Sequence, residues 1–592
     1  MIVSPGMSLG LQAAATALNP YDFARLSSEE LGRTLTSATT TLGTEFDTAG
    51  VLNYAPNNLA LYSDDLSNAA WTKSGTTIAV NQAVGRDGLS TLDRVKEAAG
   101  TGAHWVLHDT TVVNGSRIVM SGVVKGWNRD WAFLEIYSSG GTGQQYLSIN
   151  LTDGSYSEIV ASGGAFIESS VTDLGGGLYE WSATVTASSA TMRLIASPAE
   201  SDGTGRPTFA GDTGKGIYLG GLQIEQASLT QIAPTPYHTT TSAAYFGPRK
   251  QVVYDGAAWL DKGLLVEGAA TNMLTYSEQL DNAAWTKTNA TAGANAAVSP
   301  DGKTTMDSFT GDAGTAGKSL RTAVTMVNGT DYVYSFFVKK QASFIQVYSN
   351  SGWGGNSKAN INLSTGAVSA DFSFTASAED FGTFWRVSVE GPATSTSSNI
   401  YISLITDITS ARGSSTAVVG PIYLWGMQFE LGTSPTSYVP TVASAVTRGG
   451  DDISILTADI TGWDDEIGTF VVEHGQMSGS ERLLSGESNA AVLYKSTNIS
   501  TYNLSAALNS ANGDVTTAGD HTSAVAGDAS GRSITVDGAA VTSDSNTFIG
   551  TDITRLDIGK QDNNSNYLNG HIARITYYPT RLSDAAIQAL TA

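Results

Sequence analysis

The chain has 592 residues, no cysteine and a formal net charge of −23, from 32 basic and 55 acidic side chains. The missing cysteines exclude disulfides and thiolate metal sites, and no basic cluster is present to favour nucleic acid or an anionic membrane as a partner. The charged fraction of 15% is below the roughly 25% of ordinary globular proteins, and the 64 glycines are typical of short strands joined by tight turns.

The first 35 residues differ in composition from the rest. Leu9–Leu18 permits a helix, and Ser27-Ser28-Glu29-Glu30 resembles a helix start. We interpret residues 1–35 as a short, partly helical anchoring segment, although a frayed terminus explains the pattern equally well. The segment lacks a positively charged n-region, so we expect synthesis in the bacterial cytoplasm without a signal peptide. No apolar run approaches the roughly 18 residues that span a bilayer, so we expect no membrane insertion.

A long module occurs twice in the sequence. Asn68-Ala69-Ala70-Trp71-Thr72-Lys73 recurs as Asn282-Ala283-Ala284-Trp285-Thr286-Lys287, at an interval of 285 − 71 = 214 residues. Solenoid repeats have periods of roughly 20–50 residues, so this interval indicates a duplicated domain. We place the two copies at residues 36–240 and 241–447. Because Trp71 and Trp285 recur at one spacing, we expect both in the core or at a sheet edge.

Each copy has the pattern of an all-β domain. Asn328-Gly329 is a hairpin signal, and Tyr332, Tyr334, Phe336 and Val338 after it alternate as one face of a strand. Many short strands with turns between them predict tandem β-sandwiches of jelly-roll type. The strand near the end of each module lies at residues 218–225 and 423–430, so copy one carries about nine extra residues in its second half. Such differences belong in loops, which is where specificity resides.

The pattern changes near Gly450. Residues 469–474, 533–538, 555–559 and 568–578 read as strands, and a capped helix from Ser583 to Leu590 closes the chain. We therefore predict a third β-sandwich at residues 448–592.

Two motifs carry a family resemblance. Gly263-Leu264-Leu265-Val266-Glu267-Gly268 with Asn272 opens copy two, and Pro435-Thr436-Ser437-Tyr438-Val439-Pro440-Thr441 closes it. This module resembles one found in fibre, spike and minor structural proteins of tailed bacteriophages, and residues 448–592 resemble a concanavalin/laminin-G-like domain. The resemblance implies carbohydrate-binding-like sandwiches on a virion of a phage or phage-like particle. Copy one lacks the Gly-Leu-Leu-Val-Glu-Gly sequence and has a divergent exit, so its ligand site is more in doubt than that of copy two.

A glycan site needs an exposed aromatic plate beside amide or carboxylate side chains. Trp353 lies in the Gly-rich stretch Ser351-Gly352-Trp353-Gly354-Gly355-Asn356, so Trp353 and Asn356 are candidates in copy two. Trp105, Trp127 and Trp131 are the candidates in copy one. Core packing or a subunit interface is the alternative role for these aromatic residues.

Little in the sequence suggests catalysis. His104 and His108 are close together but have no third ligand at a diagnostic interval, and no nucleophile elbow or phosphate loop stands out. Asp464-Asp465-Glu466 is the densest acidic cluster, and in a loop Asp464 and Asp465 could bind Ca²⁺, although a solvated turn is the simpler reading. We therefore expect no enzymatic activity and no cofactor, with Ca²⁺ at Asp464 and Asp465 as a weak candidate.

The leading hypothesis is a virion fibre or spike that binds host surface polysaccharide for adsorption. The N-terminal segment would contact other virion proteins, and a homo-oligomer, with a trimer favoured, would supply multivalency and cover strand edges. One alternative is a tailspike-type polysaccharide depolymerase, against which stands the lack of a convincing acid pair. Another is a purely structural capsid or collar decoration protein.

Overall fold

The computed structural model describes residues 19–22, 35–203, 205–227, 231–350, 352–414, 420–477, 479–487, 491–495, 499–503, 506–509, 515–548 and 553–592. Almost every regular element in these ranges is a β-strand; the helices among them are α2 (Asp584–Leu590) and a 3-10 turn at Thr457–Asp459. The predicted all-β class is confirmed. Leu9–Leu18 and Ser27–Glu30, where a helix was expected, lie outside the described residues. No helix in the described ranges is long and apolar enough to cross a membrane.

The first sandwich belongs to a compact unit that spans Asn53–Gly247. It consists of two six-stranded antiparallel sheets. The first sheet has the order β14 (Tyr156–Ser162), β13 (Gln144–Asn150), β12 (Trp131–Ser138), β17 (Thr191–Ala199), β10 (Trp105–Thr111), β6 (Thr72–Ser74). The second has the order β15 (Glu168–Gly175), β16 (Leu178–Thr186), β11 (Arg117–Trp127), β19 (Gly216–Ala227), β8 (Ser90–Glu97), β7 (Thr76–Val84).

The second sandwich repeats this arrangement strand for strand. Its first sheet has the order β31 (Val368–Ala370), β30 (Lys358–Asn362), β29 (Phe344–Ser349), β34 (Ser397–Ile405), β27 (Ser319–Thr325), β24 (Thr286–Thr288). Its second has the order β32 (Thr375–Phe381), β33 (Phe384–Pro392), β28 (Asp331–Lys339), β35 (Ile422–Leu431), β26 (Thr304–Gly311), β25 (Ala290–Val298). The two strand orders match, as the 214-residue repeat requires, and Trp71 and Trp285 are buried in the two cores.

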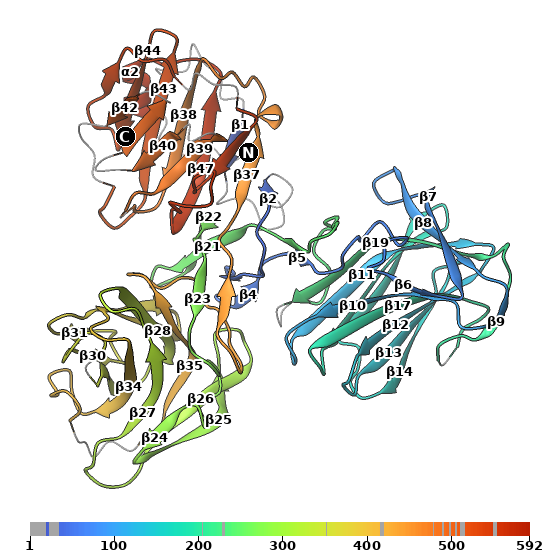
Figure 1. Cartoon of the computed structure of the whole chain (residues 1–592), viewed down its shortest axis with the longest axis horizontal. Helices are drawn as coiled ribbons and strands as arrows, with labels where there is room; N and C mark the ends of the chain where they lie inside the picture. Colours follow the sequence, from blue (N-terminus) through green and yellow to red (C-terminus); the bar gives the residue numbers. More distant parts are fainter. Residues whose placement is uncertain are drawn as a thin grey trace. The chain divides into compact units, whose positions relative to one another are not determined.

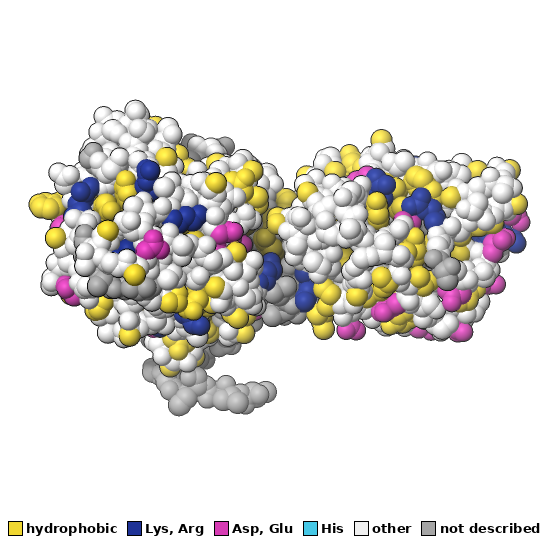
Figure 2. Space-filling view, turned by 90° about the horizontal axis from the view of Figure 1, so that it is seen from below, with side chains coloured by type: hydrophobic (Ala, Val, Ile, Leu, Met, Phe, Trp, Pro, Cys, Tyr) yellow, Lys and Arg dark blue, Asp and Glu magenta, His cyan; other side chains and the backbone are white. Residues whose placement is uncertain are grey.

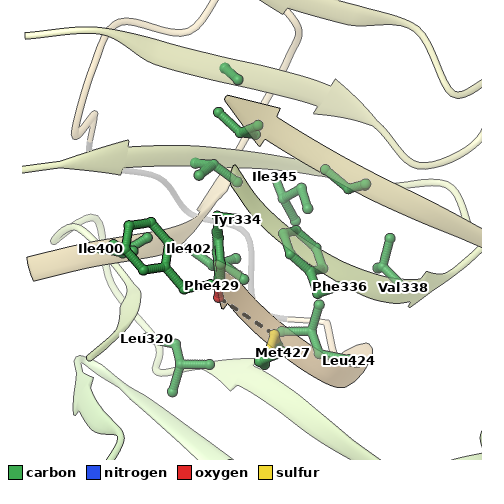
Figure 3. Close-up of a cluster of buried hydrophobic side chains, with 14 of the residues drawn as sticks. Leu320, Tyr334, Phe336, Val338, Ile345, Ile400, Ile402, Leu424, Met427 and Phe429 are labelled. Atoms are coloured by element: carbon green, nitrogen blue, oxygen red, sulfur yellow. Dashed lines mark hydrogen bonds between the residues drawn. The ribbon is translucent and has the colours of Figure 1, made fainter. Parts of the chain in front are cut away.

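The second core shows how strand alternation builds the sandwich. Tyr334, Phe336 and Val338 point from β28 toward Leu320, Ile345, Ile400 and Ile402 of the opposite sheet (Figure 3). The predicted shared face of Tyr332, Tyr334, Phe336 and Val338 is therefore confirmed, since all four belong to this core. The hydroxyl of Tyr334 donates to the sulfur of Met427 at 3.4 Å, and that of Tyr332 accepts from the Val327 backbone amide at 2.9 Å, so both hydroxyls on this face have partners.

The Asn-Gly turns do not form hairpins. Gly115 and Gly329 adopt the positive φ expected of such turns, at 82° and 81°. However, β27 pairs with β24 and β34, while β28 pairs with β33 and β35. The turn at Asn328-Gly329 thus carries the chain from one sheet to the other, and the hairpin prediction is wrong there.

The third sandwich includes strands from both ends of the chain (Figure 1). One sheet has the order β21 (Arg249–Tyr254), β22 (Trp259–Val266), β47 (Gly570–Tyr578), β38 (Gly468–His474), β43 (His521–Asp528), β44 (Gly531–Val536), β45 (Thr542–Asp544), with β1 (Asn19–Asp22) paired to β47. The other has the order β2 (Thr36–Ser37), β37 (Ile453–Leu456), β46 (Arg555–Ile558), β39 (Arg482–Gly486), β40 (Ala491–Lys495), β41 (Ile499–Asn503), β42 (Ala506–Asn509). Helix α2 begins after Ser583, whose Oγ accepts a hydrogen bond from the Ala586 amide at 3.3 Å.

The other sheets in the described residues are four two-stranded ribbons. They are β3 (Thr44–Phe46) with β4 (Leu52–Tyr54), β5 (Asn57–Asn58) with β20 (Tyr245–Phe246), β9 (Gly100–Gly102) with β18 (Phe209–Gly211), and β23 (Ala270–Asn272) with β36 (Val446–Arg448). The second compact unit combines residues 1–52 with 248–592. The sequence assigned residues 36–52 to the first module and residues 249–266 to the second, whereas β2 and the β21–β22 hairpin pair with strands of the third sandwich.

Candidate functional site

The first sheet of the second sandwich has an outer face that carries polar and aromatic side chains. Side chains alternate between the two faces of a strand. Because Leu320, Ile345, Ile400 and Ile402 point into the core (Figure 3), Arg321, Gln346, Tyr348 and Tyr401 point away from it. We call this surface the outer face of the second sandwich.

A single row of cross-strand partners forms the middle of the outer face. Arg321 on β27 is paired with Tyr401 on β34, Tyr401 with Tyr348 on β29, and Tyr348 with Lys358 on β30. The rings of Tyr348 and Tyr401 are stacked, with centroids 4.7 Å apart and planes 8° from parallel. Both tyrosines are half-buried. The row therefore presents two adjoining aromatic rings between two cations.

Guanidinium groups lie against this aromatic pair. The Arg412 guanidinium, from the loop after β34, is 5.2 Å from the Tyr348 centroid, and that of Arg321 is 6.0 Å from the Tyr401 centroid. Arg321 also donates to Oδ1 of Asn399 at 2.9 Å, and Arg412 donates to the carbonyl of Ser349. Cation–π contact fixes both guanidinium planes at the surface.

Amide side chains flank the row on one side. Asn350 and Asn399 lie beyond Tyr348 and Tyr401. Oδ1 of Asn350 accepts from the backbone N–H of Asn399 at 2.8 Å and from Oγ of Ser398 at 2.9 Å. Asn350 is exposed. Its bound carbonyl oxygen orients the side chain and leaves the NH₂ group as a donor.

On the other side of the row, amides lie beneath the loop of residues 406–414. Gln346 donates to Oδ1 of Asn360 at 2.7 Å, and Asn360 donates to the carbonyls of Ile408 and Ser410, both at 2.9 Å. Gln346 and Asn360 are buried. These bonds hold the loop down on the sheet, which is what places Arg412 over Tyr348.

The equivalent surface of the first sandwich is covered. Thr72 is the repeat partner of Thr286, and Leu107 pairs with Thr72 as Arg321 pairs with Thr286. Cross-strand partners from Leu107 onward give the corresponding row: Leu107, Ile195, Glu135 and Tyr146. Glu135 is only 1% exposed, and Arg206 from the loop after β17 donates to its carboxylate at 2.8 and 3.0 Å. The Arg206 guanidinium also lies 5.8 Å from the Trp105 ring centroid. The loop after β17 therefore covers this face with an ion pair.

The prediction that Trp353 is an exposed plate is wrong. Its side chain is 0% exposed, its Nε1 donates to the carbonyl of Gly391 at 2.8 Å, and its ring is 4.5 Å from that of Phe374. Gly354 and Gly355 both have φ of 61°, so the glycines serve a tight turn that directs the tryptophan into the core. Asn356, three residues on, is exposed.

The three tryptophans of copy one fall on two surfaces. Trp105 and Trp131 lie half-buried on the same outer face, because Val106 and Ala132 beside them point into the core. Trp127 lies on β11 in the other sheet, where the Arg94 guanidinium is 4.3 Å from its ring centroid. The structure thus brings Trp105 and Trp131 to one face and separates Trp127 from them.

Asp464 and Asp465 lie in a loop before β38. Asp465 accepts from Nε1 of Trp463 at 2.9 Å, and Asp464 accepts from the Glu466 amide at 2.8 Å. Among the residues that the structure describes, no three His, Asp or Glu side chains gather in a group able to hold a metal ion. Ca²⁺ binding here stays a prediction.

A cavity of about 200 Å³ lies elsewhere, among β3, the β21–β22 hairpin and residues 435–438. Burial raises the pKa of Glu379 at its wall, against the opposing effect of Arg386. Of its other charged groups, Lys250 pairs with Asp261 and Glu267 pairs with Arg249. The cavity lies where three segments pack together, whereas the outer face has an open row of ligand-type groups, so we place the candidate site on the outer face.

The residues of the outer face were missed at the sequence level. Val347-Tyr348 and Ile400-Tyr401-Ile402 show the alternation that assigns each tyrosine to the face opposite the core. What the sequence does not contain is the register between β29 and β34, which are separated by about fifty residues and make the tyrosines partners.

No family model and no curated protein matches the chain. Solved structures align with it weakly. The CBM22-1–CBM22-2 tandem domain of Paenibacillus barcinonensis Xyn10C is 13% identical, with 64% of this chain and 98% of that one covered and a TM-score of 0.23. The LG1-3 region of the laminin α2 chain is 11% identical, covers 81% and 94%, and has a TM-score of 0.15. Scores this low carry no argument about function, and the sandwich fold is established by the strand order itself.

Trypanosoma rangeli sialidase also aligns, at 12% identity over 88% of this chain and 98% of that one, with a TM-score of 0.20. The sequence predicted a protein without enzymatic activity. That prediction is corrected, because a glycosidase is among the structures that align with the chain. The TM-score of 0.20 gives no basis for assigning the sialidase's reaction to this protein.

Proposed function

We propose that this protein binds glycan through the outer face of the second sandwich. The observation that carries the proposal is the stacked pair Tyr348–Tyr401, with the amides of Asn350 and Asn399 beside it. Aromatic rings suit the weakly polar C–H faces of a sugar, and oriented amides suit its hydroxyls. The groups lie on adjacent strands of one sheet, so they are in place before a ligand arrives and little ordering is needed on binding.

We propose further that binding serves adsorption of a tailed phage or phage-like particle to a host surface polysaccharide. The support is the resemblance of the modules at 36–240 and 241–447 to those of phage fibres and spikes, together with the duplication. Assembly into a homo-oligomer, with a trimer favoured, would multiply weak sites. The N-terminal segment would then contact other virion proteins.

Glycan-array binding followed by calorimetry tests the glycan proposal. We expect Tyr348→Ala combined with Tyr401→Ala to weaken binding by about tenfold or more, because each aromatic ring that packs on the ligand contributes on the order of 1 kcal/mol. Tyr137→Ala is the matched control, because Tyr137 is half-buried on the corresponding face of the first sandwich. Unchanged binding in the double variant would contradict the proposal. The same incubations are examined for new reducing ends, which would reveal hydrolysis.

A further inference from the structure

We infer that the outer face of the second sandwich takes an anionic saccharide, one bearing carboxylate or sulfate groups. This inference rests on the proposed glycan binding and names the class of glycan. It comes from the charges of the row and from a comparison of the two sandwiches.

The row is basic in a chain that is acidic overall. Arg321 and Lys358 are the ends of the row Arg321–Tyr401–Tyr348–Lys358, three strand spacings or about 14 Å apart. Arg412 is placed between them by its contact with Tyr348. Three cations thus lie along one side of a sheet in a protein whose acidic side chains outnumber its basic ones by 55 to 32.

Two of these cations lack a carboxylate partner. Lys358 pairs with Asp371 at 2.7 Å. Neither Arg321 nor Arg412 forms an ion pair with any residue that the structure describes; their contacts are an amide oxygen, a backbone carbonyl and the tyrosine rings. A guanidinium has several N–H donors in a planar fork, so each arginine keeps donors free for a carboxylate or a sulfate.

In the first sandwich, a carboxylate occupies the position that corresponds to Tyr348. Glu135 occupies the register position of Tyr348, and the loop arginine Arg206 binds its carboxylate through Nε and Nη2. In the second sandwich the corresponding loop also delivers an arginine, Arg412, but the residue beneath it is a tyrosine. The first sandwich therefore carries its own anion at this place, and the second has the arginine without the anion.

This difference predicts that the second sandwich binds the anionic ligand and the first does not. An anionic ligand at the first sandwich would have to displace Glu135 from Arg206 and would meet Leu107 where the second sandwich has Arg321. At the second sandwich it meets the stacked tyrosines, with the Arg412 guanidinium against Tyr348 and that of Arg321 against Tyr401. Charge-assisted hydrogen bonds to arginine are stronger than neutral ones.

Calorimetry with three hexasaccharides tests the inference on the full chain: chondroitin 4-sulfate, unsulfated chondroitin and carboxyl-reduced chondroitin. We expect at least one of the two anionic forms to bind about tenfold or more tightly than the neutral form, and comparison of the two separates sulfate from carboxylate recognition. Arg321→Ala with Arg412→Ala should reduce the affinity for the anionic form to that for the neutral form. Arg193→Ala is the control, since Arg193 pairs with Asp109 on the outer face of the first sandwich.

Circular dichroism on each variant establishes that it is folded, and Arg321→Lys with Arg412→Lys should retain part of the anion preference. Equal affinity for all three saccharides, with Tyr348 and Tyr401 still required, would overturn the anionic inference and leave glycan binding standing. Binding of none of them, together with an empty glycan array, would overturn both.

Discussion

Glu135 and Tyr348 occupy the same register position in the two repeated sheets. Each lies beneath a loop arginine, Arg206 after β17 in the first sandwich and Arg412 after β34 in the second. The two copies therefore share the scaffold and the loop arginine, while the residue beneath is a carboxylate in the first and an aromatic ring in the second. In the first sandwich the arginine neutralises a buried charge. In the second it faces an aromatic ring and keeps donors available. On the face of the molecule that Figure 2 shows, charged side chains are scattered over a largely uncharged surface.

The ion pair of the first sandwich predicts a stability effect. Arg206→Ala removes the partner of a carboxylate that is 1% exposed, so Glu135 is left as a buried charge. Breaking a buried pair in this way costs about 3–5 kcal/mol, and partial exposure of Arg206 reduces the expected loss to about 2 kcal/mol. Chemical denaturation followed by tryptophan fluorescence measures it.

Arg193→Ala is the control for that experiment. Arg193 and Asp109 are an exposed pair on the same sheet, so their loss should change the free energy of unfolding by less than about 1 kcal/mol. If the two variants are equally stable, the covering role of Arg206 is wrong.

The parts of the fold that depend on local pattern were predictable. The alternation of Tyr332, Tyr334, Phe336 and Val338 predicts a strand face. The repeat at Trp71 and Trp285 predicts a shared place in the core or at a sheet edge, and both are in the core. Trp353 misled, because its glycines were interpreted as a loop that exposes the ring, whereas their positive φ directs it inward.

The pairing of strands that are far apart in the chain could not be predicted from the sequence. Both β1 and β22 pair with β47, which lies hundreds of residues further along the chain. Nothing in the local sequence of Leu264-Leu265-Val266 distinguishes a strand of the module from a strand of the third sandwich. The same limit hid the Arg321–Tyr401–Tyr348–Lys358 row, since its members come from four strands in non-sequential order.

A buried ion cluster joins the β21–β22 hairpin to the start of the third sandwich. Arg249 donates to Asp451 and, at 2.8 Å, to Glu267, which Arg448 also approaches at 3.1 Å. Burial alone would raise the pKa of Glu267, but Arg249 and Arg448 outweigh it and lower that pKa to about 2. Arg249→Met should lower the free energy of unfolding by about 3–5 kcal/mol, because it leaves buried carboxylates with one cation fewer.

Arg574→Ala provides the comparison, since Arg574 and Glu473 form a more exposed pair on the same sandwich. Differential scanning calorimetry should resolve a large shift for Arg249→Met and almost none for Arg574→Ala. Similar melting temperatures for both would show that the cluster adds nothing to stability.

Trp353 should matter for stability and not for ligand contact. Trp353→Phe removes the donor to the Gly391 carbonyl and part of a buried ring, so we expect a loss of about 1–3 kcal/mol. Glycan affinity measured below the unfolding transition should stay within about twofold of the unchanged protein. A selective loss of affinity in a fully folded variant would restore Trp353 as a binding residue.

The pH dependence of stability in the first sandwich should carry the signature of Glu225. This side chain is 1% exposed, and burial raises its pKa to about 7, although hydrogen bonds from Thr235 act to lower it. The folded state therefore holds a proton that the unfolded chain releases near pH 4.5. The resulting stability is fully present below about pH 4.5 and is lost as the pH rises to about 7, with a slope of at most about 1.4 kcal/mol per pH unit.

Glu225→Gln removes this titration, so the free energy of unfolding of the variant should vary less between pH 4.5 and 7 than that of the unchanged protein. Urea denaturation at half-unit pH steps measures both curves, and Glu168→Gln, on exposed β15, should leave the slope as it was. Parallel curves for Glu225→Gln and the unchanged protein would mean that Glu225 is ionised in the folded state throughout this range. In that case its hydrogen bonds from Thr235 would outweigh its burial.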